Sequence, residues 1–171
     1  MRTAVIIGGG LGGLFTGAIL SKEGFKVTIL EKNTTVGGGL QNFKRFGLKF
    51  DTGMHVIGGM RPGGNIYRIC QYLGIVDKVS LMNVDDECTD SLYFAEDKHT
   101  YHIQKGREGF VNSLAVHFPN EKENLKAYVD AVFGLVDEIS LFHLRPSSDM
   151  LTTHSDNFMI AADAFIAKYI K

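Results

Sequence analysis

The stretch from Thr3 to Glu31 constrains the fold more than any other part of the sequence. Residues 4–7 form a short apolar run of the β-branched kind that is typical of a buried parallel strand. The run is followed by Gly8-Gly9-Gly10-Leu11-Gly12-Gly13, which fits the pattern G-x-G-x-x-G. A second apolar run, residues 27–30, ends at the carboxylate of Glu31. This order predicts a strand, a helix and a second strand, with the helix N-terminus facing an anionic group.

Each glycine of the pattern has its own physical role. Gly8 allows the tight turn out of the strand, Gly10 lets a pyrophosphate approach the backbone, and Gly13 lets the helix pack close to the strand. We expect the pyrophosphate to contact these three glycines together with Leu11 and Gly12. An ordinary glycine-rich turn is the alternative, but the register of strand, helix, second strand and terminal acid favours a dinucleotide site.

The acid at the end of the second strand narrows the choice of dinucleotide. A carboxylate about 20 residues after the glycines accepts hydrogen bonds from ribose hydroxyls, so we expect Glu31 to bind the adenosine ribose. A 2′-phosphate would be repelled, which favours FAD or NAD over NADP. Lys32 follows directly and is included in the expected cofactor site. Residues 11–19 carry apolar side chains at the spacing of one helix face, with Lys22 in the last turn and Gly24 as the stop.

The bulk composition describes a globular chain of one domain, or one and a fraction. The 171 residues are 44% hydrophobic and 22% charged, with a net charge of −1. No basic run is present, so we expect no nucleic-acid partner. No apolar segment reaches the roughly 18 residues that a membrane span needs. Cys70 and Cys88 have no C-x-x-C spacing and are interpreted as free, buried thiols, which favours a cytoplasmic location.

Three features follow the acid. Gly37-Gly38-Gly39 indicates backbone that lies close to a ligand, with a flexible linker as the alternative. Residues 43–50 alternate apolar and polar side chains around Gly47, which predicts a β-hairpin. The run Asp51-Thr52-Gly53-Met54-His55 then returns the chain.

Together with the glycine pattern and Glu31, these features resemble the FAD-dependent amine-oxidase and phytoene-desaturase superfamily. The resemblance covers residues 3–60, and residues 47–55 are most similar to the retinol saturase branch and its carotenoid isomerase relatives. It implies FAD as the cofactor and an oxidoreductase that acts on carbon–carbon double bonds of an apolar polyene, such as a retinoid or carotenoid. Many phytoene desaturases have an arginine after the glycine doublet. This chain has Gly39 at that position. The retinol saturase branch also lacks the arginine, so this difference agrees with the resemblance.

The resemblance also assigns expected roles to residues beyond the first glycines. Gly37, Gly38 and Gly39 would pass close to the phosphates and the ribityl chain, and Met54 and His55 would approach the isoalloxazine region. A structural role for His55, as a hydrogen-bonded residue of the ribbon, stays open. No catalytic acid or base is assigned. No metal site is expected, because the acidic residues 85–87 are interpreted as a solvated loop.

The second half of the sequence predicts a hairpin and several helices. A helix is expected from residue 64 to Gly74, a hairpin over 91–95 and 100–104, and a helix over 109–118. A long helix then starts near Asn120 and ends at Pro146 and Ser147-Ser148, and a final apolar helix covers 157–170. The broad apolar face of the long helix favours a core helix, with peripheral membrane contact or a substrate tunnel as alternatives.

The expected fold class is therefore α/β. A Rossmann-like FAD-binding βαβ unit with an incomplete parallel sheet and a β-ribbon occupies residues 1–64, and the start of an α+β substrate domain occupies residues 65–171. Because the resembled chains are much longer, we expect a truncated chain whose site is completed by a C-terminal portion or by a second chain. Alone, it would be inactive and would bind FAD weakly or not at all. The alternative function is a stand-alone or split dinucleotide-binding module without redox turnover.

Overall fold

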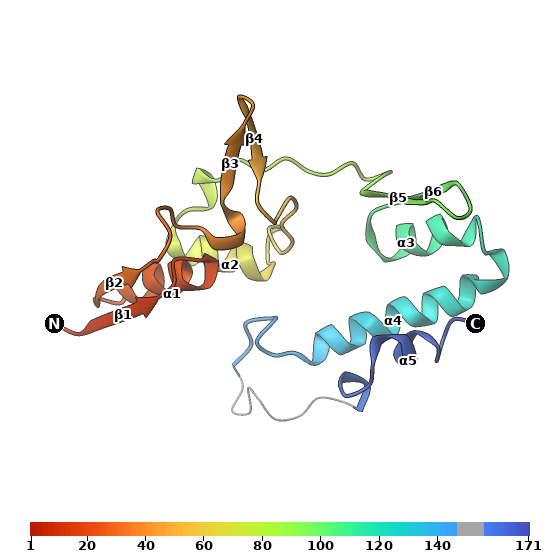
Figure 1. Ribbon diagram of the computed structural model, residues 1–171. Helices are drawn as coiled ribbons and strands as arrows, with labels where there is room; N and C mark the ends of the chain where they lie inside the picture. The colour runs from red at the N-terminus through yellow and green to blue at the C-terminus, as the bar shows by residue number, and fades with distance from the viewer. Residues whose placement is uncertain (147–155) are drawn as a thin grey trace. The chain divides into compact units, whose positions relative to one another are not determined.

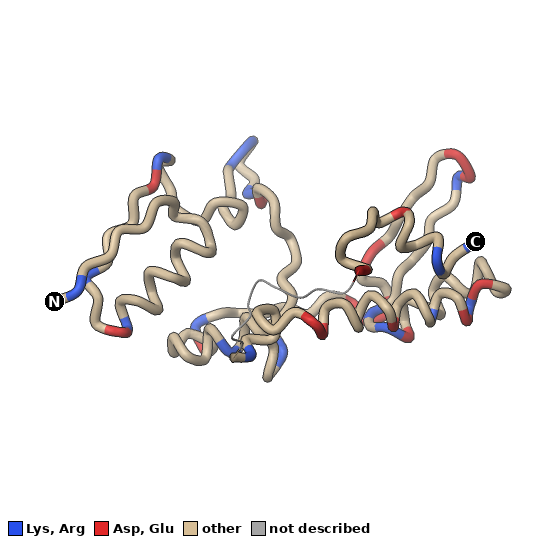
Figure 2. Tube along the Cα trace, turned by 90° about the horizontal axis from the view of Figure 1, so that it is seen from below, with Lys and Arg blue, Asp and Glu red and all other residues tan. Residues whose placement is uncertain are grey.

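The computed structural model describes residues 1–146 and 156–171, which form two compact units, residues 1–80 and 81–171. The first unit contains a parallel strand pair, a hairpin and two α-helices, and the second contains a hairpin followed by helices (Figure 1). We expected a domain boundary after residue 64. By packing, residues 65–80 lie with the first unit. Lys and Arg are interspersed with Asp and Glu in both units (Figure 2).

The predicted βαβ unit is confirmed. Strand β1 (Thr3–Ile7) pairs in parallel with β2 (Lys26–Leu30), and helix α1 (Leu11–Lys22) makes the crossover between them (Figure 1). The helix ends as expected, because Gly24 takes a left-handed conformation with φ +82° that other residues rarely adopt. The glycine loop thus lies at the carboxyl end of β1, where ligands bind in open parallel sheets.

Helix α1 packs on the strand pair through glycine. A Cβ added at Gly17 would lie 2.9 Å from Cδ1 of Ile29, which shows how close the two backbones approach. We expected the buried face to be that of Leu14, Phe15 and Ala18. Those three side chains instead border a hollow shared with Leu73 and Ile75, at the end of helix α2 (Asn65–Leu73). The helix is apolar on more than one side because it has neighbours on more than one side.

One face of the strand pair is uncovered. Val5, Ile7 and Leu30 are 66%, 89% and 54% exposed, whereas Ile6 and Ile29 face α1. The expectation of a strand buried on both faces is therefore wrong for this structure, because α1 covers one face and no described element covers the other.

The β-ribbon after the acid is confirmed as the hairpin of β3 (Asn42–Arg45) and β4 (Leu48–Asp51). The rings of Phe43 and Phe50 stack across it at 5.4 Å. Helix α2 (Asn65–Leu73) follows and ends at Gly74, with φ +72°, as predicted. The Tyr72 hydroxyl donates to Glu23, which ties α2 to the end of α1. Short 3-10 turns complete the unit: η1 (Gly38–Leu40) and η2 (Val76–Lys78).

The second unit begins with the predicted hairpin, formed by β5 (Asp90–Phe94) and β6 (His99–Ile103). Helix α3 (Gly106–Ala115) and the turn η3 (Pro119–Glu121) lead into helix α4 (Lys122–Glu138). The core of this unit is the contact between α3 and α4, where Val111, Leu125 and Val129 are buried. Cys70 of the first unit is also buried, but Cys88 is only half-buried, so the expectation of two buried thiols is wrong for Cys88.

Two helix predictions are wrong in extent. Helix α4 ends at Glu138 because the next residue, Ile139, turns to an extended conformation. The predicted end lay at Pro146 and Ser147-Ser148, and those serines are outside the described residues. The final helix is short: η4 (Asp156–Phe158) precedes α5 (Ala162–Ile166), and the buried ring of Phe165 packs on Tyr128 of α4 at 6.0 Å. None of the helices in the described ranges is long and apolar enough to cross a bilayer.

Candidate dinucleotide-binding site

The glycine loop connects the end of β1 to the start of α1. Gly8 has φ +101°, and its amide donates to the carbonyl of Leu30 at 2.7 Å, so the turn begins where the two strands end. Gly10 is the N-cap of α1, and its carbonyl accepts the first helical hydrogen bond, from Leu14, at 2.9 Å. A Cβ added at Gly13 would lie 2.0 Å from the carbonyl oxygen of Gly8, so only glycine fits there.

The start of α1 is open to an anion. Gly10 provides no side-chain cap and the first turn contains no acidic residue. The amides of Leu11, Gly12 and Gly13 have no partner within the helix, and the helix dipole adds a partial positive charge there. A Cβ added at Gly10 or Gly12 would meet no atom within 4 Å. This is the space that a pyrophosphate needs to reach the amides.

The side chain of Glu31 is hydrogen-bonded to the glycine loop. Its Oε2 accepts a hydrogen bond of 2.7 Å from the amide of Gly9, and its Oε1 accepts one of 2.8 Å from the amide of Asn33. These bonds, first that of Asn33 and then that of Gly9, hold the pKa of Glu31 below its ordinary value of 4.5, so the carboxylate is ionised at neutral pH. A carboxylate has about four acceptor positions, which leaves acceptors for ribose hydroxyls.

The glycine doublet forms the third side of the site. The amide of Gly37 donates to the carbonyl of Gly9 at 2.7 Å, and Gly37 forms a parallel bridge with Gly10. A Cβ added at Gly38 would lie 3.2 Å from the α-carbon of Gly10. Gly37 and Gly38 have φ angles of +121° and +56°, which glycine adopts without strain. Backbone that the sequence separates by almost 30 residues therefore meets at the helix N-terminus.

The remaining predicted site residues are less closely held. The chain after the hairpin returns toward the doublet, since a Cβ added at Gly53 would lie 3.4 Å from the carbonyl oxygen of Gly39. Met54 is 44% exposed. The side chain of His55 is 71% exposed and lies 3.8 Å from Asp51. Lys32 is exposed beside Glu31. Exposure and one acidic neighbour assign no catalytic role, so their places near a flavin stay predictions.

Two residues of the site were missed from the sequence. Gly9 stands at a variable position of the pattern, yet its amide binds Glu31 and a Cβ there would lie 3.0 Å from Cγ1 of Val36. Asn33 contributes its amide to the other oxygen of Glu31. Gly9, the second of three consecutive glycines, was the available signal, because the pattern itself requires only Gly8, Gly10 and Gly13.

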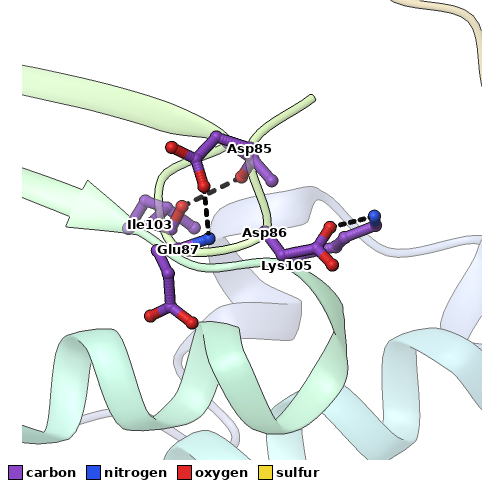
Figure 3. Close-up of polar contacts among 6 residues, drawn as sticks. Asp85, Asp86, Glu87, Ile103 and Lys105 are labelled. Atoms are coloured by element: carbon purple, nitrogen blue, oxygen red, sulfur yellow. Dashed lines mark hydrogen bonds and ion pairs between the residues drawn. The ribbon is translucent and has the colours of Figure 1, made fainter. Parts of the chain in front are cut away.

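The acidic residues before β5 act as anchors for the hairpin. The amide of Glu87 donates to Asp85 at 2.9 Å, and Asp86 pairs with Lys105 at the end of β6 (Figure 3). The amide of Lys105 also donates to the carbonyl of Asp86 at 3.0 Å. Over the described residues, no three His, Cys, Asp or Glu side chains gather in a way that could hold a metal ion.

A known family model matches the segment that forms this site. Residues 6–73 match the model of a family described as the NAD(P)-binding Rossmann-like domain. The match runs from the last two residues of β1 to the end of α2, so it includes the glycine loop, Glu31 and the glycine doublet.

Curated relatives confirm the resemblance to the retinol saturase and carotenoid isomerase branch. The all-trans-retinol 13,14-reductase of Rattus norvegicus is 35% identical over 135 residues, which are 75% of this chain and 21% of the relative. Prolycopene isomerase 2 of an Oncidium hybrid cultivar is 30% identical over 142 residues, which are 83% of this chain and 24% of the relative. The chain thus spans about a fifth to a quarter of the length of these relatives.

A solved structure supports the fold. The crystal structure of an oxidoreductase from Methanosarcina mazei aligns with 92% of this chain and 37% of its own, with a TM-score of 0.51 and 23% sequence identity. At that identity the likeness establishes the α/β fold alone.

Proposed function

We propose that this chain is the N-terminal, FAD-binding part of an oxidoreductase that acts on carbon–carbon double bonds of an apolar polyene. The observation that carries the proposal is the convergence of Glu31 and the Gly37-Gly38 doublet on the glycine loop at the start of α1. The relatives named as a retinol reductase and a prolycopene isomerase support the choice of substrate class.

The residues present fit a dinucleotide with a free ribose. The open space at Gly10 and Gly12 admits the pyrophosphate to the helix amides, and the ionised Glu31 accepts from ribose hydroxyls while it repels a 2′-phosphate. The hairpin that follows the doublet favours FAD over NAD, because a simple dehydrogenase would continue with a helix and a third parallel strand. FAD, when bound, supplies the hydride chemistry.

The protein's own contribution in this segment is binding and orientation. The amides at the start of α1 neutralise part of the pyrophosphate charge without the arginine that follows the doublet in many phytoene desaturases, since Gly39 stands at that position. The doublet lies against Gly10 and limits where the phosphates can rest. Glu31 holds the loop and the ribose together.

We also propose that a partner segment adds strands to the edge of the β1–β2 pair and covers its exposed face. This segment would come from a longer form of this polypeptide or from a second chain. Val5, Ile7 and Leu30 present an apolar surface of the kind that parallel strands bury on both faces. A two-stranded parallel pair is also smaller than the sheets that parallel strands build. Peripheral contact with a membrane, which would deliver an apolar substrate, stays a prediction.

The test is a titration of the chain into FAD, followed by flavin fluorescence anisotropy, with Gly10→Ala and Gly58→Ala as matched variants. A Cβ at either position meets no protein atom within 4 Å, so both variants keep the fold. Gly10→Ala is expected to weaken FAD binding about tenfold or more, because the methyl group occupies the pyrophosphate space. Gly58→Ala should leave the affinity for FAD nearly unchanged. NADP⁺, added as a competitor, should displace little FAD. Equal affinity of both variants for FAD would overturn the proposal.

A further inference from the structure

The second unit contains an apolar cavity that the dinucleotide site does not use. Its volume is about 540 Å³, within the range of roughly 300–1,000 Å³ that small-molecule sites occupy. It lies between the open ends of β5 and β6, the first turns of α3 and the middle of α4, and every lining residue belongs to the second unit. The cavity therefore exists independently of how the two units are placed.

The walls of the cavity are built on regular elements. Leu92 and Ile103 come from the hairpin, Phe110 from α3, and Val132 and Phe133 from α4. Ile103 is 8% exposed. Val129, at the same wall, is 6% exposed and belongs to the core between α3 and α4. Because buried core residues form this wall, regular elements fix that side of the cavity.

Two of the three charged residues of the lining are cationic. Lys105 and Arg107 line the cavity, and Asp90 is the acid among the lining residues. The guanidinium of Arg107 lies over the ring of Phe133, 3.8 Å from its centroid. Its ion pair with Asp130 is long, at 3.7 Å, and its side chain is 49% exposed, so it retains donors for another anion. A guanidinium held against an aromatic wall is a suitable partner for a carboxylate.

We propose that this cavity is a binding site for an apolar carboxylic acid, an extended hydrocarbon or polyene chain with one carboxylate. The apolar walls take the chain, and Arg107, with Lys105 beside it, takes the carboxylate. Lys105 is also paired with Asp86 (Figure 3), outside the cavity lining. The site is separate from the glycine loop and does not require FAD.

The experiment uses cis-parinaric acid, a polyene fatty acid that fluoresces in apolar surroundings, and its methyl ester as the neutral probe. Both are titrated into the 171-residue chain and four variants. Val132→Phe fills the cavity and Arg107→Gln removes the cation. Val116→Phe, at a position 79% exposed, and Lys98→Gln, in the β5–β6 turn, make the same changes outside the cavity.

The wild-type chain and both control variants should bind the acid saturably with a stoichiometry of about one. Val132→Phe should weaken the acid and the ester alike by about tenfold, and Arg107→Gln should weaken the acid about tenfold while leaving the ester unchanged. Non-saturable binding, or equal binding of acid and ester by the wild-type chain, would contradict the proposal. If Val132→Phe fails to fold, the binding of the acid and of the ester by the Arg107→Gln variant tests the proposal by itself. Flavin anisotropy on the same samples reports the dinucleotide site separately.

Discussion

The carboxylate of Glu31 and the amide of Gly9 are joined by a hydrogen bond of 2.7 Å, although 22 residues separate them in the sequence. The acid that a dinucleotide fold directs toward the ribose is therefore also part of the loop that receives the pyrophosphate. Its second oxygen is occupied by the amide of Asn33. Loss of this side chain should change both the stability of the loop and the binding of the dinucleotide.

Glu31→Gln should lower the melting temperature of the first unit. A glutamine has one carbonyl oxygen and cannot accept from both Gly9 and Asn33, and its NH₂ group would face one of the two amide donors. The measurement is thermal unfolding followed by circular dichroism. Glu96→Gln, in the exposed β5–β6 turn, is the control. An unchanged melting temperature for Glu31→Gln would show that the two hydrogen bonds contribute nothing to the fold.

The pH dependence of the loop follows from the direction of the Glu31 pKa shift. The folded chain lowers this pKa below 4.5, so the stabilisation is present above pH 4.5 and is lost as the pH falls through the folded pKa. The amide resonance of Gly9, followed by NMR, should titrate with a midpoint below 4.5. A midpoint at or above 4.5 would mean that the carboxylate is not held by the two amides.

Gly13→Ala and Gly12→Ala should have opposite effects on stability. A Cβ at Gly13 would lie 2.0 Å from a backbone oxygen, so Gly13→Ala should lower the free energy of unfolding by about 1–3 kcal/mol. A Cβ at Gly12 meets nothing within 4 Å, and alanine raises helix propensity by up to about 1 kcal/mol. Urea unfolding measures both. Equal destabilisation by the two variants would contradict the loop geometry.

Ile6 and Ile7 are neighbours on β1, but their side chains lie on opposite faces of the strand pair. Ile6 faces α1, so Ile6→Ala should lower the free energy of unfolding by about 2 kcal/mol. Ile7 is 89% exposed, so Ile7→Ala should change it by less than about 0.5 kcal/mol in this chain. The comparison by urea unfolding checks which face of the strand pair α1 covers. A larger loss for Ile7→Ala would show that the other face is covered instead.

Much of the first unit could be predicted because its signals are local. The short apolar runs, the glycine spacing and the hairpin signal at Gly47 each specify backbone within a few residues. The exposed faces of Val5 and Ile7 could not be predicted, because a buried parallel strand and an uncovered one have the same apolar sequence. The bond between Gly9 and Glu31 depends on the register of two strands, which no short pattern encodes.

The second unit was predicted less well for a related reason. The apolar residues 157–170 suggested one continuous helix. Instead, Phe165 and Tyr169 are brought to Tyr128 by a short helix and turns, so tertiary contact rather than periodicity decides their conformation. Likewise, the contact of Arg107 on α3 with the ring of Phe133 on α4 joins residues that are distant in sequence.

The most direct test of the account is a ¹⁵N–¹H NMR titration of the 171-residue chain with FAD and, separately, with NADP⁺. The account predicts saturable shifts of the Leu11, Gly12 and Gly38 amides with FAD, even if the affinity is low, and much smaller shifts with NADP⁺, because the ionised Glu31 repels a 2′-phosphate. If FAD leaves these amides unshifted, or if NADP⁺ shifts them as far as FAD does, the assignment of this loop as an FAD site is wrong.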